Sequence, residues 1–221
     1  AEFEALNGWG GAYYGKFSYD GGNHVIRNFT PEVKEPVDNV GGYYSSTLFG
    51  VAAGEIKNLG VIDCNIVNGK LGVGALAGYA GHGNSTDLKI DNVFVTGKIS
   101  GDNVYTGGFV GTTAKDLTIS NSYAVVDVAG TYTGGIVGRL RNTLTLSNGY
   151  VKATITSNGQ EDKSGLIAGS DKTPAVNVNK FFAVGSGKTV GTGVTGNATA
   201  ALPEYTEQVA GVIRTLDAFN E

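Results

Sequence analysis

Several residue types are scarce or missing in this chain of 221 residues. It contains no methionine, including an initiator, so we expect it to be a piece of a longer chain. Its one cysteine, Cys64, has no second cysteine with which to form an internal disulfide bond. Cys64 alternates with Ile62 and Ile66, and no His with Asn or Asp accompanies it as a partner set. We therefore expect a buried thiol rather than a nucleophile.

Positive charge and long apolar runs are also lacking. The net charge is −4 and the sequence pI is about 5.2. Because the chain has neither a basic run nor an RNA-binding aromatic motif, we expect no nucleic-acid partner. No stretch approaches the roughly 20 apolar residues that a membrane-spanning helix needs. We therefore expect no membrane span.

Glycine, by contrast, is abundant at 36 residues and is distributed periodically. A block made of a small residue, a hydrophobic pair and a closing glycine occurs five times. The closing glycines are Gly50, Gly78, Gly111, Gly138 and Gly169. A second block follows each of them and ends on an asparagine, with Ile or Leu two positions earlier in the first four copies. These asparagines are Asn58, Asn92, Asn121, Asn148 and Asn179. A period of about 30 residues is typical of a solenoid, a propeller or an array.

The segments between the blocks alternate apolar and polar residues and are rich in β-branched and aromatic side chains, which predicts strands. Two positions after the asparagine, four copies carry an aromatic residue: Phe94, Tyr123, Tyr150 and Phe181. Such residues stack when each repeat is one coil and the coils lie about 4.8 Å apart. A propeller blade needs about 40 to 50 residues, whereas about 30 residues hold three short strands. We therefore predict an all-β fold, a right-handed parallel β-helix of about five or six coils.

The repeated asparagine and glycine fit such a coil. Asparagine tolerates the left-handed backbone conformation, so it suits a bend between sheets, where stacked amides would form a ladder. The alternative is a surface asparagine in an ordinary turn. Glycine suits positions where the chain bends or coils approach closely, because it has no Cβ.

The sequence divides into three parts of one structural domain. Residues 1–45 would form an N-terminal cap and a first partial coil, residues 46–190 the repeats, and residues 191–221 a loop and a short amphipathic C-terminal helix. That helix is predicted by an apolar stripe with helical spacing, and we expect it to pack on the β-helix. The stripe consists of Tyr205, Val209, Val212, Leu216 and Phe219. Aromatic residues crowded near the N-terminus would either cover the first coil or offer a platform for sugars or protein partners.

The hydrophobic pair closed by glycine, with Ile-x-Asn and an aromatic residue downstream, resembles the GLUG repeat of bacterial cell-surface proteins. Phe109-Val110-Gly111 and Ile136-Val137-Gly138 are examples of the pair. The resemblance covers roughly residues 9–185 and implies a repeat array in large secreted or surface-anchored proteins of Bacteroides-type bacteria, among them adhesins and some immunoglobulin A peptidases. The family's repeats carry no known catalytic residues. The fifth copy departs from the pattern, because Asn177-Val178-Asn179 replaces Ile-x-Asn.

Four cations form the most concentrated charge of the chain. They follow the closing glycine by one to four residues in copies three to five, and we call them the basic stripe: Lys115, Arg139, Arg141 and Lys172. The stripe would receive an anionic glycan or sulfate, or would be a solvated edge that discourages aggregation. Lys98 and Asp127 occupy one column of the repeat and would form a surface ion pair or part of a site. Our alignment shows no column with acids in adjacent copies.

The function expected from these observations is that of a non-catalytic module of a secreted or cell-surface protein. It would act as an adhesin segment or rigid stalk that contacts a glycan, a host or cell-surface protein, or further domains of a longer chain. His24 and His82 have no second His or Cys at ligand spacing, so we expect no metal site and no cofactor. The alternative is a carbohydrate-active β-helix enzyme, a polysaccharide lyase or glycoside hydrolase, that uses scattered Lys, Arg and Asp residues.

Overall fold

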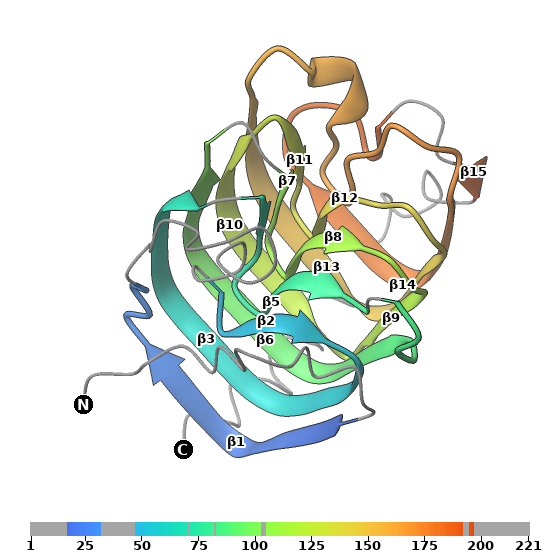
Figure 1. Ribbon diagram of the computed structural model, residues 1–221. Coiled ribbons are helices and arrows are strands. Elements are labelled where there is room, and N and C mark those ends of the chain that lie inside the picture. The colour runs from blue at the N-terminus through green and yellow to red at the C-terminus, as the bar shows by residue number, and fades with distance from the viewer. Residues whose placement is uncertain are drawn as a thin grey trace.

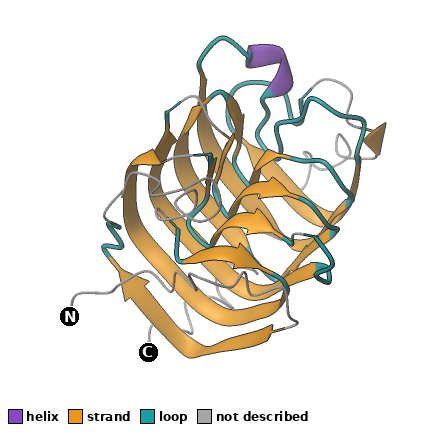
Figure 2. Cartoon of the chain, in the orientation of Figure 1, coloured by secondary structure: helices purple, strands orange, loops and turns teal. Residues whose placement is uncertain are grey.

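The computed structural model describes residues 17–31, 47–69, 71–81, 83–102, 105–191 and 195–196. Within these ranges the chain is built almost wholly of strands, and one 3-10 turn, Glu161–Lys163, interrupts them (Figures 1 and 2). The strands are β1 (Phe17–Arg27), β2 (Phe49–Ala52), β3 (Gly54–Gly69), β4 (Gly72–Val73), β5 (Ala77–Ala80), β6 (Leu88–Gly101), β7 (Tyr105–Gly107), β8 (Val110–Thr113), β9 (Leu117–Ser120), β10 (Tyr123–Gly130), β11 (Tyr132–Gly134), β12 (Val137–Arg139), β13 (Leu144–Ser157), β14 (Ala175–Val184) and β15 (Thr195–Gly196).

The strands pair in parallel in three sheets. The long sheet runs in the order β1, β3, β6, β10, β13, β14, β15, with β9 between β6 and β13. A four-stranded sheet holds β2, β5, β8 and β12, and a three-stranded sheet holds β4, β7 and β11. The chain visits the three sheets in turn, so successive turns of the chain stack, and Figure 1 shows the short strands lying across from the curved long sheet. The predicted all-β parallel solenoid is confirmed.

About four coils are stacked, where the sequence led us to expect five or six. The four-stranded sheet takes one strand from each of four coils. The fifth glycine block forms only single bridges, Gly134 with Gly165 and Val137 with Ala168. At the other end, β1 adds a rung to the long sheet.

The interior of the solenoid is filled by columns of apolar side chains. One column consists of the residue two positions before the asparagine, and its members are register partners on neighbouring strands of the long sheet. These are Ile56, Ile90, Ile119 and Leu146, each at most 1% exposed. Burial of side chains of this size stabilises the fold by about 1.5–3 kcal/mol each before ordering costs.

The asparagines sit at the bend in the strands of the long sheet. Asn58, Asn92, Asn121 and Asn148 all have left-handed backbone conformations, with φ of 54°, 55°, 49° and 49°. Their amides hydrogen-bond along the stack: Asn92 Nδ2 donates to Asn58 Oδ1 over 2.9 Å, and Asn148 Nδ2 donates to Asn121 Oδ1 over 2.6 Å. Between these two pairs the ladder is broken, because Asn121 Nδ2 donates to the Asp91 carboxylate instead, over 2.7 Å.

The prediction for Asn179 is wrong by one residue. In the fifth copy the left-handed corner is Lys180, with φ of 51°, whereas Asn179 pairs with Ser147 in the strand before the corner. The aromatic position shifts with it. Phe182 is the register partner of Tyr150, and Phe181 points into the core instead. Compared with copies three and four, this copy has one more residue between its closing glycine and its corner, so the left-handed bend falls on Lys180.

The aromatic column lies outside the core. Phe94, Tyr123 and Tyr150 are successive register partners, and their rings stack with centroids 5.3 and 4.9 Å apart and interplanar angles of 14° and 4°. Offset stacking at this separation stabilises aromatic pairs. The rings belong to a hydrophobic cluster separate from the interior one.

The closing glycines occupy one register position of the four-stranded sheet and its extension. A Cβ on Gly138 would lie 2.3 Å from the Thr106 backbone nitrogen, and one on Gly111 would lie 2.2 Å from that of Val73. Thr106 and Val73 belong to the three-stranded sheet. The repeated glycine therefore lets the two short sheets approach to backbone contact, which is why the sequence repeats it.

Two predictions fall outside the described residues. The C-terminal helix of residues 203–221 lies beyond them, and so do most of residues 1–45, of which 17–31 are described and include β1. The three-part division of the chain stays a prediction.

Candidate functional site

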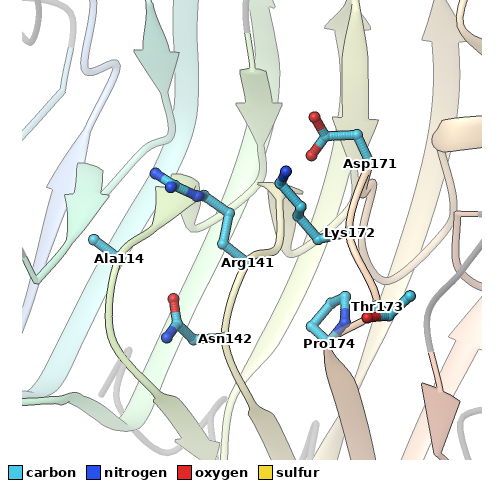
Figure 3. Close-up of a pocket in the computed structure, with 7 residues that line it drawn as sticks. All are labelled: Ala114, Arg141, Asn142, Asp171, Lys172, Thr173 and Pro174. Carbon is cyan, nitrogen blue, oxygen red and sulfur yellow. The ribbon is translucent and has the colours of Figure 1, made fainter.

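A shallow depression of about 640 Å³ lies at one corner of the solenoid (Figure 3). Turns of three successive coils line it: one follows β8, one follows β12 and one precedes β14. The lining residues are Ala114, Arg141, Asn142, Asp171, Lys172, Thr173 and Pro174. The two cations of this lining, Arg141 and Lys172, belong to the predicted basic stripe.

Hydrogen bonds to the neighbouring coils fix these turns. The Arg141 backbone N–H donates to Thr113 Oγ1 over 2.9 Å. Ser170, which is fully buried, donates its hydroxyl to the Leu140 carbonyl over 2.7 Å and accepts the Lys172 N–H over 3.0 Å. The backbones that carry Arg141 and Lys172 are therefore held by the stack itself, so their separation changes little when the side chains move.

Arg139 is bound by an acid at the rim of the depression. Its Nε and Nη2 donate to the two carboxylate oxygens of Asp171 over 2.8 and 2.6 Å, and its Nη1 donates to Tyr105 Oη over 2.9 Å. Its guanidinium carbon also lies 4.7 Å from the Tyr105 ring centroid. The hydrogen bonds from Arg139 lower the pKa of Asp171, and those to Asp171 raise the pKa of Arg139. Such a bidentate pair leaves Arg139 little capacity for another anion.

Arg141 and Lys172 have no ion-pair partner among the described residues, and Figure 3 shows them on adjacent turns of the depression. Asn142 and Thr173 add polar groups to the same surface. Lys115 follows Ala114 in the turn after β8 but is not part of the lining, and its stem packs over Gly81. The structure thus divides the basic stripe: two members share the depression, one is neutralised and one lies apart.

The partners of Arg139 were not identified from the sequence, although a signal for one was present. Tyr105 and Tyr132 belong to a repeated Tyr-Thr-Gly-Gly segment and are register partners, with ring centroids 5.4 Å apart. Asp171 belongs to no repeated motif. Its approach to Arg139 depends on the stacking of coils 32 residues apart in sequence.

The acidic residues include one column that we did not recognise in the alignment. Lys98 and Asp127 are register partners on exposed positions, as predicted, but the structure records no ion pair between these two described residues. The expectation that no column holds acids in adjacent copies is wrong. Asp87 and Asp116 directly precede the register partners Leu88 and Leu117, and Asp87 accepts the Asp116 N–H over 3.3 Å. Asp116 in turn accepts the Thr143 N–H over 3.0 Å, so these carboxylates bind backbone at the corner.

The described ranges hold neither a reactive thiol nor a metal site. Cys64 is 2% exposed, and burial raises the pKa of its thiol to about 12, which makes it a poor nucleophile. No group of three or more His, Cys, Asp or Glu residues in the described part of the chain is arranged to hold a metal ion. No helix within those residues has the length and apolar character to cross a membrane.

Comparison with known proteins shows the fold. No family model matches the sequence, and no curated protein matches it. The structure resembles the crystal structure of a protein from Bacteroides ovatus that has been proposed to be an immunoglobulin A1 protease, with a TM-score of 0.61 and 24% sequence identity. The match covers 89% of this chain and 57% of the other, so the chain spans little more than half the length of that protein. The class defined by fold and comparison is a parallel β-solenoid.

Proposed function

We propose that the chain is a non-catalytic, GLUG-like module of a secreted or cell-surface protein of the Bacteroides type, and that its depression binds an anionic glycan. The observation that carries the proposal is that Arg141 and Lys172 face one depression from adjacent rigid turns without an ion-pair partner among the described residues. The amide of Asn142 and the hydroxyl of Thr173 lie beside these cations and can hydrogen-bond sugar hydroxyl groups. A glycan that carries sulfate or carboxylate groups also carries such hydroxyls. The repeat pattern and the Bacteroides ovatus neighbour support the proposed setting.

Binding to a panel of sulfated, uronate-bearing and neutral polysaccharides tests the proposal. The protein should bind members of the charged groups and not the neutral one, and Arg141→Ser with Lys172→Ser should weaken binding at least about tenfold. A matched control is Lys89→Ser with Lys152→Ser, which removes the same charge from exposed positions of the long sheet. Binding should also fall between low and physiological salt, where exposed charges are screened over about 8 Å. Salt-independent binding, or equal loss in the control variant, would refute the proposal.

A carbohydrate-active enzyme is the second candidate, and the register of Lys98 with Asp127 is the observation in its favour. Polysaccharide-degrading enzymes on such a sheet would place charged groups on neighbouring coils along the bound chain. The same panel distinguishes the two functions: release of oligosaccharides that is lost in Lys98→Ala or Asp127→Ala would favour the enzyme. The activity attributed to the Bacteroides ovatus protein belongs to that protein, which is longer than this chain.

A further inference from the structure

An apolar column runs along the outer face of the long sheet, across all of its main rungs. Its members are register partners from one strand to the next: Val25, Gly60, Phe94, Tyr123, Tyr150 and Phe182. We call these six residues the outer column. Val93 and Val95 on either side of Phe94 point into the core, and Phe181 and Ala183 do so on either side of Phe182. Because side chains alternate along a strand, the two rings point away from the core.

The rings of the outer column are buried although they face outward. Phe94 is 2% exposed, and Tyr150 and Phe182 are each 5% exposed. Stacking within the column does not account for this burial. Tyr123 has a ring on both sides and is only partly buried, whereas Phe94 has Gly60 on one side and is almost fully buried. The Phe94 ring also lies over Gly60, and Ile62, Val125 and Val178 pack against the rings of the column. These three flanking side chains are themselves only partly buried, so we attribute the remaining cover to another layer over the column.

We infer that the outer column is the docking surface of the C-terminal segment, residues 203–221. That segment carries the stripe of Tyr205, Val209, Val212, Leu216 and Phe219, which would bury one apolar face of a helix. From Tyr205 to Phe219 such a helix is about 21 Å long at 1.5 Å per residue. The outer column spans five inter-strand steps, about 24 Å at 4.8 Å each. The two apolar surfaces match in length when the helix crosses the strands.

The end of the described chain lies close enough for this arrangement. Thr195 and Gly196 pair with Ala175 and Val176, so the chain is left beside the start of β14. Phe182 is six residues further along the same strand, a distance of at most about 20 Å. Six residues separate Gly196 from Pro203, and an extended stretch of that length also reaches about 20 Å. The segment can therefore begin at the Phe182 end and continue towards Val25.

Cysteine cross-linking in the full chain tests the inference. Tyr123→Cys, at the centre of the outer column, is combined with Val209→Cys, Val212→Cys or Leu216→Cys from the stripe. The matched control combines Tyr123→Cys with Arg214→Cys, on the opposite side of the predicted helix from the stripe. Cys64 is buried and should not compete. Under mild oxidation, at least one stripe pair should form an intramolecular disulfide in most molecules, and the control pair should form it in few.

The other outcomes overturn the inference. A disulfide-linked dimer would show that a second copy covers the outer column. Equal cross-linking of Arg214→Cys would show that the helix does not contact the outer column through its apolar stripe. Absence of any cross-link would show that residues 203–221 lie elsewhere. A second measurement does not depend on the Tyr123 variant: Val212→Asp with Leu216→Asp should increase binding of a hydrophobic dye several-fold over Arg214→Asp. Equal dye binding by the two variants would also overturn the inference.

Discussion

Thr106 and Thr133 are register partners in the three-stranded sheet, and the hydroxyl groups of both are buried without a hydrogen-bond partner in the structure. Each side chain is 0% exposed. In the preceding coil the same position is Val73, which is equally buried. A buried hydroxyl that forms no hydrogen bond destabilises the fold by about 1–3 kcal/mol. These threonines therefore stabilise the protein less than valine, which has the same shape without the hydroxyl.

The double variant Thr106→Val with Thr133→Val should therefore leave the free energy of unfolding unchanged or raise it by about 1–2 kcal/mol. Chemical denaturation at neutral pH measures the change. Thr112→Val is the matched control, because the Thr112 hydroxyl is also fully buried but donates to the Arg139 carbonyl over 3.1 Å. The control should lower stability by about 1 kcal/mol. A large loss of stability in the double variant would show that the two hydroxyls have partners.

Replacing a closing glycine by alanine should lower the free energy of unfolding strongly, although alanine adds only a Cβ. Gly138→Ala would place a Cβ 2.3 Å from one backbone nitrogen of the facing sheet, and backbone cannot move aside as a flexible side chain can. We expect a loss of at least about 3 kcal/mol in the free energy of unfolding, since overpacking alone typically costs about 1–3 kcal/mol. Gly159→Ala is the control: nothing lies within 4 Å of its added Cβ, and its φ of +79° costs only about 1–2 kcal/mol. Equal losses would mean that the sheets can separate.

Two substitutions of the corner residue Asn121 distinguish the contribution of its backbone conformation to stability from the contribution of its side-chain hydrogen bonds. Asn121 has a φ of 49°, accepts from Asn148 and donates to Asp91. Asn121→Gly keeps the left-handed conformation accessible and removes only the amide, so it should lower stability by about 1 kcal/mol. Asn121→Ala removes the amide and also strains the backbone, so it should lower stability by about 1–2 kcal/mol more. Thermal and chemical unfolding of both variants measure the difference, and identical stabilities would assign the whole effect to the amide.

The extent to which the sequence predicts this structure follows from the range of the interactions involved. The interior column of Ile56, Ile90 and Ile119 and the corner asparagines were predictable, because each coil imposes the same local requirement and the requirement repeats. Lys180 was missed because the residue with left-handed φ is determined by its position at the bend. In the fifth copy the asparagine, Asn179, stands one residue before that position. The pairing of Arg139 with Asp171 was missed for a different reason. It joins two coils through side chains that no repeat specifies, so only the stacked structure reveals it.

The Arg139–Asp171 pair predicts a pH dependence with a definite sign. Hydrogen bonds from Arg139 lower the pKa of Asp171 in the folded state below its unfolded value of about 4, so the unfolded state binds more protons in acid. The stability that the pair contributes is therefore fully present above about pH 4 and is lost as the pH falls through the folded-state pKa. Both side chains are mostly covered, with 17% and 21% exposed, and we expect a contribution of about 1 kcal/mol.

Asp171→Asn should be less stable than the parent protein by this amount at pH 7, and the difference should shrink below about pH 4. Asp127→Asn, which removes an exposed carboxylate with no recorded ion pair, should match the parent at both pH values. If the deficit of Asp171→Asn stays constant from pH 7 to pH 3, ionisation of Asp171 does not contribute to stability.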